Sequence, residues 1–157
     1  MNSKRTPIIV GVTLVLVLAA LFMIPRLTDP TRGLAALWKA AGVDCLTMGH
    51  SRVLQHFHPH LEIIVDGREE PIPANIGVLR DCMSEVHTHD GAGTIHVEAA
   101  SGDKSFYLKD FFAVYGKELN RTGYLLTATA DGQPVSDAAN LLLQDKQIII
   151  LEYKSAQ

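Results

Sequence analysis

The chain of 157 residues lacks the signatures of several common protein classes. No cluster of Lys and Arg is interleaved with aromatic residues, and the formal net charge is -3, so we expect no nucleic-acid partner. No serine, histidine and acid order, glycine-rich phosphate loop or zinc-finger spacing is present. Internal repeats and low-complexity segments are also missing. These absences indicate one ordinary domain whose chemistry comes from another residue type.

Cysteine is scarce, because Cys45 and Cys82 are the only two in the chain. If the domain lies outside the cytoplasm, these two thiols can form a disulfide, and we predict that they do. The alternative is that Cys82, five residues before His87, joins a mixed cysteine and histidine site of the kind that soft metals prefer.

The N-terminal segment has the pattern of an export signal. Lys4 and Arg5 precede a strongly apolar run from Ile8 to Ile24, which Pro25 closes. The run is at the short limit for a spanning helix, and no small-residue cleavage site follows it. We therefore predict an uncleaved, single-pass signal anchor over residues 1–27, rather than a cleaved signal peptide. This anchor would leave the N-terminus in the cytoplasm and tether the rest of the chain outside it, in the periplasm or its equivalent.

The remainder divides into a linker and a domain. Residues 28–54 form the linker, with a short helix over Arg32–Ala41 and a stop at Gly42. Residues 55–157 have the mixed pattern of an α+β domain, with a small mixed or antiparallel sheet of four or five strands and one main helix. The helix is predicted over Tyr107–Leu119, and the later strands are predicted over Tyr124–Ala130, Gln133–Val135 and Gln147–Tyr153.

Histidine is the residue type that stands out. All seven histidines lie between His50 and His96, and five of them fall in the segments His56–His60 and His87–His89. The alternation from His56 to Val65 predicts a strand with its imidazoles on one face. Pro59 cannot donate to a ladder, so we expect an edge or a bulge there.

A second strand is predicted over Ser84–His89, followed by a turn at Asp90–Gly93 and a third strand over Thr94–Glu98. If four residues close this hairpin, His87 lies directly opposite His96. The three histidines of the hairpin then share one face, with Glu85 and Glu98 beside them.

Two neighbouring strands with histidines at alternate positions can hold a transition metal. We predict an ion, with copper slightly preferred over zinc, bound by residues drawn from His58, His60, His87, His89 and His96. His50 and His56 are weaker candidates, and Asp90 fits equally a partner that orients an imidazole or a turn residue. Glu62, Glu85 and Glu98 are open to three interpretations, as ligands, as a general base or as solvated carboxylates.

The predicted function is transition-metal binding outside the cytoplasm, with the membrane and the ion as partners and no protein partner identified. One alternative is a mononuclear metalloenzyme with an open coordination position and Glu98 or Asp90 as base. The other is an interaction or assembly module that holds no metal and senses pH through its histidines. The sequence leaves both open.

Several motifs together resemble a known family. They are His58-Pro59-His60-Leu61, Ile72-Pro73-Ala74-Asn75-Ile76-Gly77, His87-Thr88-His89-Asp90 and Ile95-His96-Val97-Glu98. The pattern resembles small bacterial and archaeal extracytoplasmic domains that are tethered by an N-terminal hydrophobic segment and have no settled function. The resemblance covers about His56 to Tyr153 and supports the domain limits and the histidine pairing, but it implies no substrate. The C-terminal part is also similar to β-grasp domains, in which a helix crosses a small mixed sheet and a final apolar strand enters its centre.

Overall fold

The structure is a computed structural model that describes residues 30–46 and 52–156. The chain divides into two compact units, Met1–Gly33 and Leu34–Gln157, and the second contains the fold and the site. The predicted anchor, residues 1–27, lies outside the described residues. Within the described ranges, no helix has the length and apolar character needed to cross a membrane.

Helix α2, Pro30–Ala40, follows the predicted short helix closely. Gly42 adopts a left-handed φ of 86° just after it, as its position as a stop requires. Trp38 is 3% exposed and belongs to the hydrophobic core, although its neighbour Leu37 is 66% exposed. The helix therefore packs mainly through Trp38, with Ala35 also against the core.

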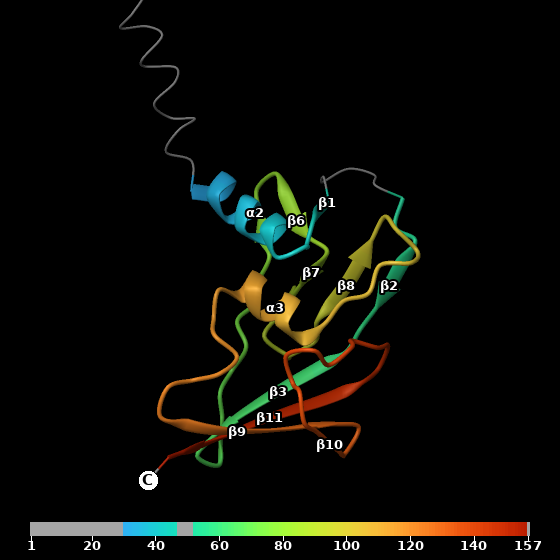
Figure 1. The fold of residues 1–157 in the computed structure, drawn as a ribbon. Helices are drawn as coiled ribbons and strands as arrows, with labels where there is room; N and C mark the ends of the chain where they lie inside the picture. Colours follow the sequence, from blue (N-terminus) through green and yellow to red (C-terminus); the bar gives the residue numbers. More distant parts are fainter. Residues whose placement is uncertain (1–29, 47–51, 157) are drawn as a thin grey trace, which may run out of the picture. The chain divides into compact units, whose positions relative to one another are not determined.

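A five-stranded sheet forms the base of the domain (Figure 1). Its order is β10-β9-β11-β3-β4, and the strands are β3 (His60–Val65), β4 (Arg68–Glu69), β9 (Tyr124–Ala130), β10 (Gln133–Val135) and β11 (Ile148–Ser155). Strand β11 runs parallel to β3, with Ile148 opposite His60, and antiparallel to β9. Ile149, Leu151 and Tyr153 alternate along β11 and are fully buried, which confirms the prediction of a central apolar strand.

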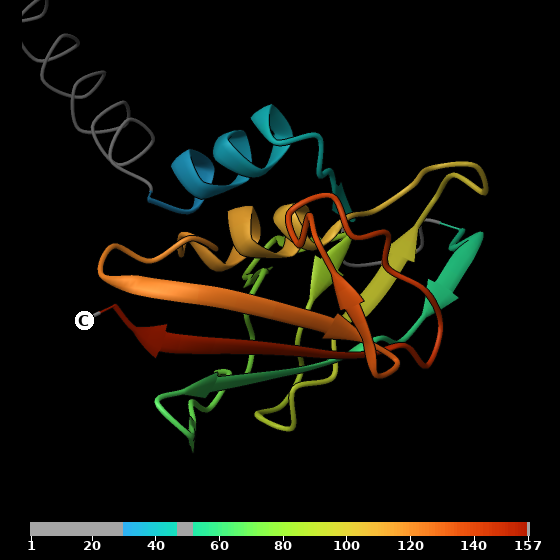
Figure 2. The ribbon, with the colours of Figure 1, turned by 60° about the horizontal axis from the view of Figure 1, so that its bottom comes forward.

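Helix α3, Leu108–Tyr115, lies over one face of this sheet (Figure 2). Asp110 starts it by accepting the Tyr107 N–H through Oδ2 at 2.8 Å, and Gly116 ends it at a left-handed φ of 71°. The helix is thus shorter than predicted. Leu119, which the periodicity assigned to the helix, is still buried, because the chain after Gly116 continues to pack on the core.

Two three-stranded sheets complete the domain. One has the order β1-β6-β5, from β1 (Cys45–Leu46), β5 (Val78–Leu79) and β6 (Cys82–Ser84). The other has the order β2-β8-β7, from β2 (Gln55–Phe57), β7 (Val86–His87) and β8 (His96–Ala99). The mixed α+β class is therefore confirmed, but the strands belong to three sheets rather than one.

Two of the predicted strands are interrupted, and both breaks bear on the site. The strand predicted over His56–Val65 is split at His58 and Pro59, so that β2 and β3 enter different sheets. Pro59 has no N–H for a ladder, and only its carbonyl is used, by the Ile95 N–H at 2.9 Å. The strand predicted over Ser84–His89 is also broken and keeps only Val86–His87 as β7.

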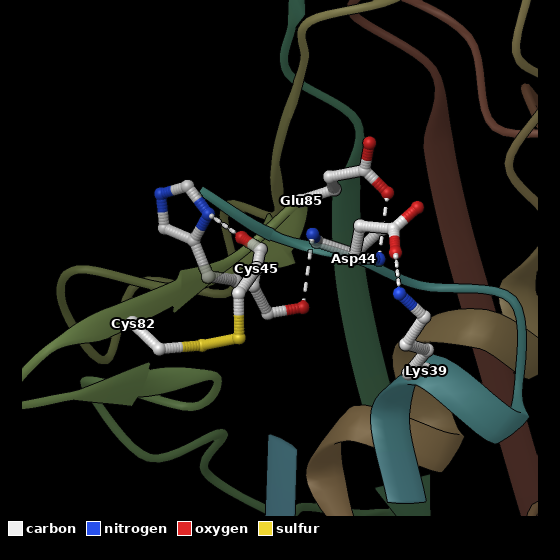
Figure 3. Close-up of a disulfide and its surroundings, with 8 residues drawn as sticks. Lys39, Asp44, Cys45, Cys82 and Glu85 are labelled. Carbon is white, nitrogen blue, oxygen red and sulfur yellow. Dashed lines mark hydrogen bonds and ion pairs between the residues drawn. A yellow bond between two sulfur atoms is a disulfide. The ribbon is translucent and has the colours of Figure 1, made fainter. Parts of the chain in front are cut away.

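The cysteines form the predicted disulfide (Figure 3). It joins Cys45 on β1 to Cys82 on β6, with 5.3 Å between their Cα atoms. Cys45 is paired with Ser84 in the same small sheet. The disulfide therefore holds the strand that leads directly into β7, and Cys82 has no thiol left to bind a metal.

Candidate metal centre

The sheet β2-β8-β7 gathers the histidines on one face. Its central strand β8 pairs His96 with His87 of β7, as predicted, and Glu98 with His56 of β2. His58 and His89 each follow two residues after a paired histidine, and their rings lie 4.6 and 4.5 Å from the ring of His96. Segments far apart in the sequence thus bring together six side chains, His56, His58, His87, His89, His96 and Glu98.

These side chains form two overlapping groups, each with its ligand atoms within 4.8 Å of one another. We call His87, His89, His96 and Glu98 the inner group, and His56, His58 and His96 the outer group. Four of the predicted ligands are therefore brought together.

The other candidates lie elsewhere. His60 is in neither group, because it begins β3 of the large sheet and lines a surface pocket beside Glu62 and Glu69. Asp90 accepts the Ala92 N–H at 3.0 Å through its Oδ1, which is the contact of a turn residue. His50 lies outside the described residues.

His87 is the anchor of the inner group. Its side chain is fully buried, and its Nδ1 lies 2.8 Å from the carbonyl oxygen of Ser84. A carbonyl only accepts, so Nδ1 carries the proton and Nε2 presents a lone pair. Burial lowers the pKa of His87 to about 4, which keeps the imidazole neutral at pH 7, as a metal ligand must be.

The spacing of the ring nitrogens suits a common ion. Nε2 of His87 lies 3.1 Å from Nε2 of His89. Two nitrogens bound tetrahedrally to one zinc-sized ion lie about 3.3 Å apart, given bonds of about 2.0 Å. The two imidazoles therefore already stand close to the separation that coordination would require.

His96 carries an unsatisfied nitrogen in the middle of the cluster. Its Nδ1 is buried and has no hydrogen-bond partner among the described residues. Such an atom is costly to leave unpaired, and coordination to a cation would satisfy it. Burial also lowers the pKa of His96, with smaller contributions from the neighbouring histidines, which favours its neutral, ligating form.

Glu98 adds the one carboxylate among these side chains. Its side chain is 15% exposed, and its Oε1 lies 3.2 Å from Nε2 of His56. Its backbone N–H donates to the carbonyl of Glu85 at 2.8 Å, which fixes this end of β8 against β7. A negative charge beside neutral imidazoles favours a cation at this place.

Thr88 explains how two histidines separated by one residue are held. Its side chain is buried on the side opposite the imidazoles, where Oγ1 donates to the Pro73 carbonyl at 2.9 Å and accepts the Ile76 N–H at 3.1 Å. The residue between His87 and His89 is thus fixed to a neighbouring loop. These bonds hold the backbone that carries both rings, in addition to the Ser84 carbonyl that orients the ring of His87.

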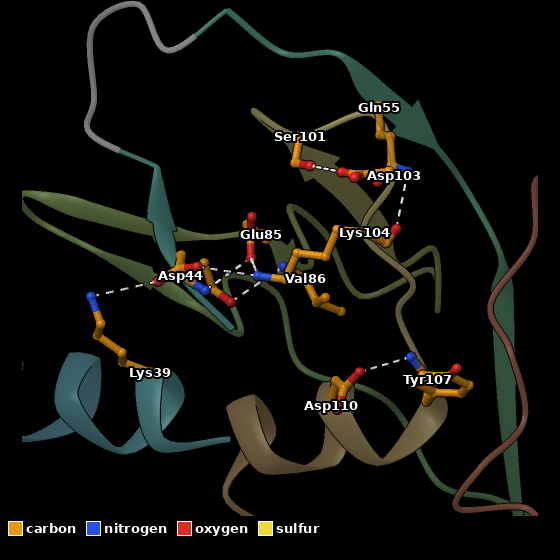
Figure 4. Close-up of polar contacts among 11 residues, drawn as sticks. Lys39, Asp44, Gln55, Glu85, Val86, Ser101, Asp103, Lys104, Tyr107 and Asp110 are labelled. Atoms are coloured by element: carbon orange, nitrogen blue, oxygen red, sulfur yellow. Dashed lines mark hydrogen bonds and ion pairs between the residues drawn. The ribbon is translucent and has the colours of Figure 1, made fainter. Parts of the chain in front are cut away.

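Glu85 has a different role from the one predicted for it. Its side chain is buried rather than solvated, and it pairs with Lys104 while accepting the Asp44 N–H at 2.9 Å (Figure 4). Lys104 also contacts the carboxylate of Asp44 at 3.2 Å. This network of Asp44, Glu85 and Lys104 stabilises the strand just before His87, and the prediction that Glu85 stands beside the histidines is wrong.

No family model, curated protein or solved structure matches this chain. The chemistry of the site is therefore inferred from its own side chains.

Sequence reasoning underrated two members of the site. His56 was a weak candidate, and Glu98 was one of three carboxylates without a preferred role. The usable signal was the register of the predicted hairpin, since Glu98 follows His96 by two residues and so shares its face. The pairing of His56 with Glu98 could not be predicted, because it depends on which edge of β8 the strand β2 occupies.

Proposed function

We propose that this protein binds one transition-metal ion through its inner group. The observation that carries the proposal is the convergence of three imidazoles and one carboxylate within 4.8 Å, at a place where His87 is already neutral and oriented. Three or four ligands of this kind make a complete protein site for zinc or copper.

Copper is slightly preferred over zinc as the ion. Three of the four donors are imidazoles, and divalent copper leads the affinity order for sites rich in nitrogen. Neither cysteine is free to act as a thiolate, so a site for monovalent copper built on thiolate is not supported. Zinc fits the same donors with a tetrahedral arrangement.

The proposed location is outside the cytoplasm, on a membrane anchor. The charged and apolar pattern of residues 4–26 supports the anchor, and the Cys45–Cys82 disulfide is typical of an oxidising compartment. We also propose a β-grasp fold and membership of the family of tethered extracytoplasmic domains. The parallel pairing of β3 with β11 at the centre of the sheet supports the fold.

The alternative of a pH sensor without metal gains little support from the site. A sensor that works near neutrality needs an imidazole that changes charge near pH 6 to 7. Burial lowers the pKa of His87, the most buried of the described histidines, to about 4, because it disfavours the charged form of the ring. The observed arrangement suits a ligand that stays neutral.

The test is the metal content of the full chain, purified in detergent, stripped with a chelator and then exposed to Cu²⁺ or Zn²⁺. We expect one equivalent in the parent and in His60→Ala, a matched control that removes a histidine outside both groups. His89→Ala removes a ligand itself. Its affinity for the ion should therefore fall by more than the roughly 10- to 100-fold that follows when a residue hydrogen-bonded to a ligand is removed. Circular dichroism would check that each variant folds.

Two results would overturn the proposal. One is a folded parent protein that takes up neither metal. The other is a folded His87→Ala/His89→Ala variant that binds as tightly as the parent, because the ion would then be held elsewhere.

A further inference from the structure

The outer group is a second convergence of imidazoles, and the proposed function does not use it. The ring of His58 lies 4.6 Å from those of His56 and His96. Among the described residues, the His58 ring has these ring contacts but no hydrogen bond. Three imidazoles that approach this closely, one of which is the His96 ring with its unsatisfied Nδ1, have the composition of a metal site.

The backbone holds this group in place. The His58 N–H donates to Oδ1 of Asp145 at 3.1 Å, and its carbonyl accepts the Lys146 N–H at 3.1 Å. Pro59 then fixes the backbone before β3 begins. His56 is held from the other side by Glu98, at 3.2 Å. The outer group is therefore built by contacts from three parts of the chain.

His96 connects the two groups. It belongs to both, and no ring contact within the described ranges joins His56 or His58 directly to His87 or His89. The outer group needs His96 to reach three ligands, and the inner group needs it to reach four, so an ion held by the full set of either group is bound by His96. The His56 side chain is 53% exposed, His58 and His96 are half-buried and His87 is fully buried, whereas His89 of the inner group is exposed.

We propose that the outer group is a capture site for the same ion, which then passes to the inner group by exchange of ligands around His96. This inference rests on the proposed function. The ion would first meet His56 and His58 at the surface, and His96 would stay bound while His87, His89 and Glu98 replace them. Only coordinate bonds to the ion form and break in this exchange, and any proton that an imidazole gives up on binding passes to water.

The test compares two variants of the full chain in stopped-flow uptake and in equilibrium titration with Cu²⁺, followed by its absorption. The capture variant is His56→Ala/His58→Ala, and the inner variant is His89→Ala, chosen because His89 is exposed and its loss leaves the core intact. His60→Ala serves again as the control.

We expect the capture variant to bind one equivalent with an affinity within about threefold of the parent, a difference of about 0.7 kcal/mol. Its uptake should be clearly slower than that of the parent and of His60→Ala, because the ligands that receive the ion first are missing. The inner variant should still bind one equivalent, weakly, with an uptake rate close to that of the parent, because its outer group is complete.

Two results would overturn the inference without touching the proposed function. They are unchanged uptake in the capture variant and loss of all binding in a folded inner variant. A parent that binds no metal would instead overturn the proposed function, so the two failures are distinguishable.

Discussion

Removal of the Lys104 ammonium should strongly destabilise the domain. Lys104→Met keeps the aliphatic stem but leaves the carboxylate of Glu85 without its cation, in a side chain that is 5% exposed. Breaking a buried ion pair on one side costs about 3 to 5 kcal/mol. Glu85 retains the Asp44 N–H, and the Lys104 side chain is 24% exposed, so we expect the lower end, about 3 kcal/mol.

The second half of this prediction is a rescue. Glu85→Gln/Lys104→Met removes both charges, while the glutamine oxygen can still accept the Asp44 N–H. We expect this double variant to recover to within about 1 kcal/mol of the parent, because no charge is left buried and unpaired. For a chain of this size, the loss in Lys104→Met corresponds to a melting temperature lower by about 6 to 12 °C.

The assay is thermal unfolding followed by the fluorescence of Trp38, the only tryptophan, which is 3% exposed in the folded state. Lys39→Met is the matched control, since this lysine contacts Asp44 at 3.9 Å with a side chain that is 80% exposed. The reasoning would be refuted if Lys104→Met had the same melting temperature as Lys39→Met, or if the double variant were no more stable than Lys104→Met.

Three further predictions concern the scaffold of the site. Reduction of Cys45–Cys82 in the native protein should lower the free energy of unfolding by about 3 to 4 kcal/mol, given a sequence separation of 37, as measured by denaturant titration with and without reductant. Gly93→Ala should cost at least about 2 kcal/mol by the same titration, because Gly93 has a φ of 80° and an added Cβ would lie 2.4 Å from the Leu61 carbonyl oxygen. The free energy of unfolding of the metal-free protein should fall by about 3 kcal/mol as the pH is lowered from 6.5 to 4, as measured by Trp38 fluorescence. His87 takes up a proton through this range in the unfolded chain, whereas its pKa in the folded protein is about 4.

Each of these has a decisive control. A Cys45→Ala/Cys82→Ala variant as stable as the oxidised parent would contradict the predicted contribution of the disulfide to the free energy of unfolding. Gly91→Ala has only an ordinary contact near its added Cβ, at 3.4 Å, so it should be clearly milder than Gly93→Ala. For the pH effect, His87→Gln should flatten the profile, and an unchanged profile would show that other groups cause it.

The sequence was informative where structure is local. The strands β9 and β10 begin and end at the predicted residues, because alternation and the turn at Asp131 and Gly132 define them without distant contacts. The pairing of His87 with His96 was predicted for the same reason, since a short connection sets the register of neighbouring strands. The core of the candidate site was therefore accessible from the chain alone.

The rest depends on contacts across the fold. Histidines alternate at 56, 58 and 60 in the sequence, yet His60 enters a ladder with Ile148 and leaves the histidine cluster. No pattern near His60 indicates that partner. Glu85 lies two residues before His87, so strand alternation assigns it to the histidine face. Its carboxylate instead pairs with Lys104 from a later segment and stays in the interior. Sheet membership and buried ion pairs are properties of the assembled chain.

The parallel ladder between β3 and β11 has a consequence for the order of folding. Ile148 and His60 are separated by 88 positions, so the centre of the large sheet closes one of the longest loops in the domain. Contacts of such high sequence separation form late and slow the search for the native state. His58 lies two residues before β3 and is held by Asp145 and Lys146, just ahead of β11. We therefore expect His58 to reach its place only when β11 docks beside β3, whereas the hairpin of His87 and His96 can form earlier from local pairing.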